Sequence, residues 1–182
     1  MPWIPNTQIA ASGGALSLIE ESILGAAGGF DFQNIPDTYR VLQIFLSARG
    51  DTAATFISVS LRFNADVGAN YHREMIGYTS GTSAINQLAG QTEIVIQEVP
   101  AASAPASYFG AASFTVPYYA TTDRFKAAYM ELAAARGAGA TTQSRFMGGG
   151  LWLSLAGINR VQLNAAIGDF VATSRAALYG IT

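Results

Sequence analysis

The stretch FDFQNIPDTYRVLQIFLSARGDTAATFISVSLRFN, residues 30–64, decides the fold class of this chain. It predicts a short strand, a proline turn, and two long strands that a polar loop joins as a hairpin. In residues 57–63, apolar residues at odd positions alternate with polar or charged ones, which is the period of a sheet with one buried face. Residues 39–48 are apolar on both faces, so we expect that strand in the middle of a sheet with both faces covered.

The rest of the chain continues this β pattern at fairly even spacing. Further strands are expected at residues 16–24, 91–99, 112–120, 141–146, 151–155, 160–165 and 170–181. Residues 65–70 and 80–90 are predicted to be loops. Pro117 indicates an edge strand or a bulge, because proline removes a ladder donor, and the three glycines at 148–150 indicate a break or a bulge. The sequence therefore predicts an all-β fold, an antiparallel β-sandwich of jelly-roll-like type with about nine or ten strands.

Residues 123–136, DRFKAAYMELAAAR, fit two different elements. Their composition has the highest helix propensity in the chain. Read with period two, Lys126 and Met130 lie on one face and Phe125 and Tyr129 on the other. Because the surrounding segments are β and the glycines after this segment fit a hairpin tip, we expect a strand, with a helix as the alternative.

The chain is expected to form one sandwich domain, residues 16–182, preceded by an irregular arm at residues 1–15. The arm contains two prolines and a Gly-Gly pair, and its large apolar residues are Trp3 and Ile4. These two residues fit an anchor that docks into a groove of a neighbouring subunit. A frayed terminus is the alternative interpretation.

The composition favours a subunit that hides much of its surface, with a weakly charged monomer as the alternative. Charged residues make up 12 % of the chain, about half the usual share, while hydrophobic residues reach 50 % and the mean hydropathy is +0.26. No apolar run is long enough to span a membrane, and the opening residues lack the basic region of a signal peptide. The net charge of −2 gives no attraction to nucleic acid, and the absence of cysteine excludes disulfides and thiolate metal sites.

No catalytic motif is present, so we expect a protein that is not an enzyme and needs no cofactor or metal. His72 is the single histidine, no G-x-S-x-G surrounds any serine, and zinc would lack a second histidine. Most acidic residues flank turns or strand ends. Asn64, Asp66 and Asn70 share one loop and could supply oxygen ligands to calcium, although the same residues suit a tight turn.

Six aromatic residues are candidate ligand or interface groups. They lie beside predicted loops and are Tyr71, Tyr78, Tyr108, Phe109, Tyr118 and Tyr119. Aromatic residues in a sandwich are more often part of the core. In the adjacent pair at 118 and 119, one ring is expected to face outward, because neighbouring strand residues point to opposite faces.

Residues 49–51 read Arg-Gly-Asp, a tripeptide that invites an adhesion hypothesis. They lie between the two long strands of the predicted hairpin. Glycine and aspartate are the residues that such a bend requires. We therefore interpret the tripeptide as a turn rather than a binding site.

Several segments resemble small virion proteins of tailed bacteriophages. The matching pieces are Phe-Asp-Phe at 30–32 with Asn-Ile-Pro at 34–36, Leu-Arg-Phe-Asn at 61–64 with Asn-Tyr at 70–71, and Arg-Ala-Ala-Leu-Tyr-Gly-Ile at 175–181. The resemblance spans residues 16–181 and rests on motifs of structural character. It implies a fibre, tail-tip or head-decoration subunit with a β-sandwich fold, often a homotrimer, and it brings no catalytic residues.

The first hypothesis is thus a non-enzymatic structural subunit of a phage virion, assembled in the host cytoplasm as a homo-oligomer and held to other virion proteins by its arm. The alternative is a tail module that binds a host-surface glycan or protein through the loops at residues 65–70, 80–90 and 100–110. A small hydrolase is a distant third. Nucleic-acid binding and membrane insertion are not expected.

Overall fold

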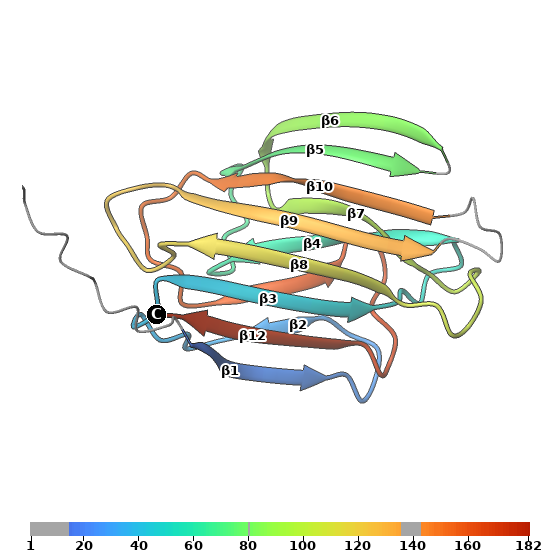
Figure 1. Ribbon diagram of the computed structural model, residues 1–182, viewed down its shortest axis with the longest axis horizontal. Coiled ribbons are helices and arrows are strands. Elements are labelled where there is room, and N and C mark those ends of the chain that lie inside the picture. The colour runs from blue at the N-terminus through green and yellow to red at the C-terminus, as the bar shows by residue number, and fades with distance from the viewer. Residues whose placement is uncertain (1–14, 80, 136–142) are drawn as a thin grey trace, which may run out of the picture.

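A computed structural model describes residues 15–79, 81–135 and 143–182. In these residues the chain is all-β and forms two antiparallel sheets that pack face to face (Figure 1). Twelve strands are present in this part of the chain, which exceeds the nine or ten expected. None of the described residues form a helix that could cross a membrane.

The larger sheet has eight strands and the smaller has four. In spatial order the larger sheet contains β1 (Leu16–Ile23), β12 (Arg175–Ile181), β3 (Val41–Ala48), β8 (Gly110–Pro117), β9 (Lys126–Ala135), β10 (Gln143–Trp152), β5 (Tyr71–Thr79) and β6 (Thr82–Gln91). The smaller sheet contains β2 (Phe30–Phe32), β11 (Val161–Ala165), β4 (Phe56–Phe63) and β7 (Ile94–Pro100).

The strand order is that of a jelly roll with two inserted hairpins. If the β5–β6 and β9–β10 hairpins are set aside, one sheet has the order β1-β12-β3-β8 and the other has β2-β11-β4-β7. These are the first, eighth, third and sixth strands facing the second, seventh, fourth and fifth, which is the double Greek key of a jelly roll. Both hairpins join the same sheet beyond β8, so they widen one sheet and leave the other unchanged.

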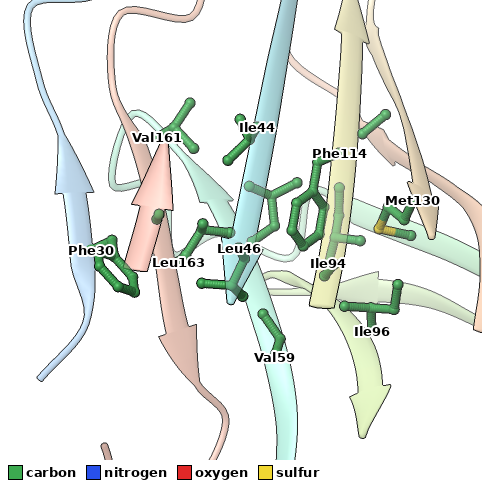
Figure 2. Packing of buried hydrophobic residues seen from close by; sticks show 14 of the residues in the cluster. Phe30, Ile44, Leu46, Val59, Ile94, Ile96, Phe114, Met130, Val161 and Leu163 are labelled. Carbon is green, nitrogen blue, oxygen red and sulfur yellow. The ribbon is translucent and has the colours of Figure 1, made fainter. Parts of the chain in front are cut away.

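The core lies between the facing surfaces of the two sheets. Figure 2 shows Ile44 and Leu46 of β3 and Phe114 of β8 pointing toward Val59 of β4 and Leu163 of β11. All five side chains are nearly or fully removed from solvent. The alternation predicted for residues 57–63 is confirmed, because the four apolar residues of that stretch are buried.

The predicted hairpin of residues 39–64 is wrong. β3 pairs with β12 and β8 in the larger sheet, whereas β4 pairs with β11 and β7 in the smaller one. The polar segment between β3 and β4 therefore crosses from one sheet to the other. The strand β3 does lie in the middle of its sheet, but only one face is covered, since Phe45 on the other face is 45 % exposed.

Three further sequence expectations are corrected. Residues 80–90 were expected to be a loop, yet β6 occupies most of that range. The glycines at 148–150 lie inside a continuous β10 that keeps its register with both neighbours. Pro117 is the last residue of β8, a central strand, so it marks the end of a strand and not an edge.

The alternative of a helix at residues 123–136 is excluded for the described part of that segment. β9 is a strand in which Ala128, Met130 and Leu132 are buried and Tyr129 is 66 % exposed. This is the period-two separation that the sequence allowed. The proposed hairpin tip after it lies outside the described residues, as does the arm with Trp3 and Ile4.

Candidate functional site

The most distinctive surface of the protein is the side of the larger sheet that points away from the smaller sheet, which we call the outer face. Strand alternation places one residue in two on this face. Its large apolar members include Leu18, Phe45, Ile76, Tyr78, Ile85, Tyr129, Met147 and Leu151, which are between 41 % and 72 % exposed. They come from β1, β3, β5, β6, β9 and β10, so the apolar surface extends across most of the sheet.

One apolar row crosses the outer face to its free edge. The strand register places Met147 opposite Ile76, and Ile76 opposite Ile85 of the edge strand β6. Glu131 of β9 lies at the inner end of the row, opposite Met147. The three apolar side chains therefore form a continuous stripe that ends at the outermost strand.

A shallow groove lies beside this row, with glycine as its floor. Gly149 has no side chain, and the register places Tyr129 on one side of it and Glu74 on the other, with Gln87 one strand further. The open groove measures about 1080 Å³ and is lined mostly by apolar groups. An exposed ring, a carboxylate and an amide therefore lie around Gly149, where the floor of the groove carries no side chain.

His72 lies at one end of the same groove, opposite Leu151. The side chain is half-buried. The groove-lining residues in the described part of the chain include no serine, threonine, cysteine or lysine. The described residues also hold no cluster of three or more histidine, aspartate or glutamate side chains suited to a metal ion. The groove can accept a ligand or a protein side chain.

Two of the six candidate aromatic residues belong to the core. Tyr71 is fully buried, its ring stacks on Trp152 at 6.3 Å, and its hydroxyl donates to the carbonyl of Phe63 at 3.1 Å. Burial raises the pKa of Tyr71 to about 12. Tyr119 is also fully buried, and its hydroxyl donates to the carbonyl of Pro36. Neither ring can meet a ligand at the surface.

The other four candidates are spread over the molecule. Tyr118 is 53 % exposed at the end of β8, with the Arg124 guanidinium 5.4 Å from its ring centre. The expectation that one ring of the adjacent pair faces outward is therefore confirmed. Tyr78 is exposed on the outer face, and it lines a second hollow together with the half-buried Phe109. Tyr108 is half-buried before β8.

The sequence did not single out the apolar residues that define the outer face. Phe45 and Tyr129 were assigned to strands and Ile85 to a loop, and none of these three was assigned to a site. Ile76 and Met147 were not assigned to a site either. Residues 39–48 and 123–136 are apolar on both faces, and this pattern could have revealed part of the outer face. The smaller sheet covers only one face of each of these strands, so the apolar residues on the other face stay exposed.

The loop that contains Asn64, Asp66 and Asn70 is a structural clip. The Asp66 carboxylate accepts hydrogen bonds from the Gly68 N–H at 2.8 Å, the Asn70 side chain at 2.9 Å and the Trp152 indole at 2.7 Å. The Asn64 amide donates to the carbonyl of Gly157 at 2.8 Å. Because the protein's own donors satisfy the Asp66 oxygens, the loop is explained without calcium.

Replacing Asp66 with asparagine tests this clip. The pKa of Asp66 is lowered, first by the indole of Trp152 and then by Asn70, so its stabilising effect is complete above the unfolded pKa. The effect is lost as the pH falls through the lower folded pKa. We expect Asp66→Asn to reduce the free energy of unfolding by about 2 kcal/mol at neutral pH and to remove part of the acid-induced loss. Urea denaturation at several pH values measures both quantities.

The control for this experiment is Asp37→Asn, at an exposed carboxylate outside the clip. It is expected to change the free energy of unfolding by less than about 0.5 kcal/mol. An Asp66 variant with the stability and acid profile of the unchanged protein would show that the clip does not stabilise the fold.

The first two residues of the Arg-Gly-Asp tripeptide are buried, and Asp51 is exposed. Arg49 is 7 % exposed, and its guanidinium donates to the carbonyls of four residues in the β7–β8 connection, namely Ala102, Ala104, Pro105 and Tyr108. Asp51 accepts a hydrogen bond from the Asp169 N–H at 2.9 Å. The turn interpretation is corrected in one respect, since the tripeptide begins a crossing between sheets and not a hairpin.

Comparison with known proteins gives no identification: no family of proteins matches this chain, and no curated protein or solved structure does.

Proposed function

We propose that this chain is a non-enzymatic structural protein that assembles with copies of itself, as a tail, fibre or capsid-decoration subunit of a tailed-phage virion. The observation that carries the proposal is the apolar outer face. Eight large apolar side chains, each between 41 % and 72 % exposed, occupy one side of one sheet. Large contiguous apolar surfaces usually belong to interfaces.

The topology supports this proposal. The two inserted hairpins extend one sheet to eight strands while the other keeps four. The enlargement adds outer-face area without adding an equal amount of core. Tyr129, Met147 and Ile76, three of the outer-face residues, lie on these added strands. A surface of this kind is suited to a permanent contact between subunits, because obligate interfaces are large and apolar.

The virion setting is supported by the resemblance of residues 16–181 to phage structural proteins. Asn64 and Tyr71, which belong to the matching pieces, hold a turn and the core in place. A homotrimer and attachment to other virion proteins through Trp3 and Ile4 belong to the same proposal. Assembly would take place in the host cytoplasm, without a cofactor.

Charging the outer face tests the proposed self-assembly. In the double variant Phe45→Lys/Tyr129→Lys, two exposed rings at the centre of the face become ammonium groups that an apolar interface must desolvate. We expect the dissociation constant of the oligomer to rise by roughly 100-fold. Light scattering over a dilution series measures it, and circular dichroism verifies the fold.

The matched control is Val67→Lys/Ile167→Lys. These two residues are 68 % and 70 % exposed but lie in loops, away from the outer face. The control is expected to keep the mass of the unchanged protein. An oligomer that responds equally to both double variants, or to neither, would contradict assembly through the outer face.

A second candidate function is binding of a host-surface glycan, and one observation favours it. Tyr129, Glu74 and Gln87 surround the hollow over Gly149, and an exposed ring beside a carboxylate and an amide suits a sugar ring. The loops first expected to bind are less suitable, because residues 65–70 form the clip and β6 occupies most of residues 80–90. A glycan array with the unchanged protein and with Tyr129→Lys would test this function.

A further inference from the structure

The edge strand β6 lacks three of the features that normally prevent strand-to-strand association, and its one bulge, between Leu88 and Gln91, leaves residues 82–88 regular. An edge strand presents unpaired backbone N–H and carbonyl groups, and monomeric proteins protect such edges with charge, proline, bulges or short length. β6 is ten residues long, TSAINQLAGQ, with no charged residue and no proline. Nine of its ten residues are exposed and the tenth is half-buried.

The other three sheet edges of the described chain are protected. β1 carries Glu20 and Glu21 and has a register shift between Leu18 and Glu20. β2 is three residues long. β7 carries Glu98, in a backbone conformation with φ of 85°, and ends at Pro100. In the described residues, three of the four sheet edges are thus protected against pairing with another strand, and β6 is the exception (Figure 1).

The geometry points to a second copy of this chain as the occupant of that edge: we propose that two β6 strands pair antiparallel about a two-fold axis at Ile85. This inference rests on the proposed function, because it adds an edge-to-edge contact between copies to the contact proposed for the outer face. A two-fold axis perpendicular to the sheet reverses the strand direction and keeps the outer face on the same side. In an antiparallel pair, residues directly opposite each other have their side chains on the same side of the sheet. The axis must therefore lie midway between one residue and the same residue of the partner.

The apolar stripe supports an axis at Ile85. This side chain is 72 % exposed, the highest value among the large apolar residues that the structure describes, and it ends the row Met147, Ile76, Ile85. In the proposed pair it meets the partner's Ile85, so the two stripes join into one row across the contact. Each copy contributes eight strands to one continuous sheet.

The remaining pairs in this register are compatible. Ser83 meets the partner's Gln87 on the outer face, and Ala84 meets the partner's Asn86 on the opposite face. Because β6 has no charged side chain, pairing with itself brings no like charges together. Residues 82–88 also keep a regular register with β5, so the strand is straight where the contact is needed.

Cysteine cross-linking tests this contact, since the chain contains no cysteine of its own. Cross-strand Cα atoms lie about 4.5–5.5 Å apart, within the range of a disulfide. We expect Ile85→Cys to form a disulfide-linked dimer under mild oxidation. Gln87→Cys should not, because the two residues would lie about 14 Å apart along the strands. Ser83→Cys mixed with Gln87→Cys should give a linked pair.

Native mass measurement of the full chain with and without Ile85→Lys completes the test. A two-fold contact requires an even number of copies, so homotrimers joined through β6 would form hexamers. Two ammonium groups at the axis should raise the dissociation constant at least about 100-fold. An isolated trimer, or an oligomer that keeps its mass in Ile85→Lys without cross-linking through Ile85→Cys, overturns this inference and leaves the proposed function standing. A monomer at every concentration overturns both.

Discussion

Replacing Gly148 with alanine is expected to lower the free energy of unfolding by about 3 kcal/mol. A Cβ atom at this position would lie 2.2 Å from the carbonyl oxygen of Glu74 and 2.9 Å from the Cα of Met75. Both atoms belong to the backbone of β5, so no side-chain rotation can relieve the contact. The strand must move away from β10, and urea denaturation followed by circular dichroism measures the cost.

The neighbouring glycine provides a matched control. A Cβ atom on Gly149 would lie 3.7 Å from the carbonyl oxygen of Ala128, which is an ordinary contact. Because glycine inside a strand costs about 0.5–1 kcal/mol relative to alanine, Gly149→Ala is expected to be neutral or slightly stabilising. Equal losses in the two variants would mean that the glycines form a flexible break, as first expected, and not a closely packed strand.

Replacing Arg49 with alanine is expected to cost about 3–5 kcal/mol of stability. The guanidinium donates to four carbonyls of the β7–β8 connection, at distances from 2.6 to 3.3 Å. Removing it leaves these acceptors without their donor and opens a cavity beneath the connection. Thermal and urea denaturation measure the loss.

Two variants sharpen that result. Arg49→Lys supplies one ammonium in place of a planar fork, so it should restore only part of the stability. Arg175→Ala removes an exposed arginine of β12 and should stay within about 0.5 kcal/mol of the unchanged protein. If Arg49→Ala kept full stability, the tripeptide would be free for an external partner and the structural interpretation would fail.

The fold class was predictable because it depends on local alternation. Residues 57–63 have a clear period of two, and their inward residues are in the core. Strand pairing was not predictable in the same way. Ile44 lies opposite Phe114 and Leu178, which are distant in the sequence, and no local pattern specifies those partners. The predicted hairpin failed for that reason.

β6 and the glycine segment were missed for different physical reasons. An edge strand exposed on both faces has no buried side and therefore no alternation, so residues 82–91 resemble a loop. The glycines at 148 and 150 are required by atoms of other segments, the β5 backbone and the Ile94 side chain. Such contacts follow from the packed structure and not from neighbouring residues.

The candidate site was only partly predictable. The low charge content predicted hidden surface, but not its location. Aromatic residues beside loops were selected, and two of them, Tyr71 and Tyr119, belong to the core. The outer face consists instead of strand residues such as Phe45 and Ile76. A sequence pattern cannot distinguish these residues from core residues, because it does not show which face of the larger sheet the smaller sheet covers.

The mass of the unchanged full-length chain in solution tests the central claim most directly. Sedimentation velocity over a wide range of concentrations is the suitable measurement. We predict a defined assembly whose mass is a multiple of the 19.1 kDa chain, and an even multiple if β6 pairs as proposed. A single 19.1 kDa species at the highest soluble concentration would contradict self-assembly through the outer face.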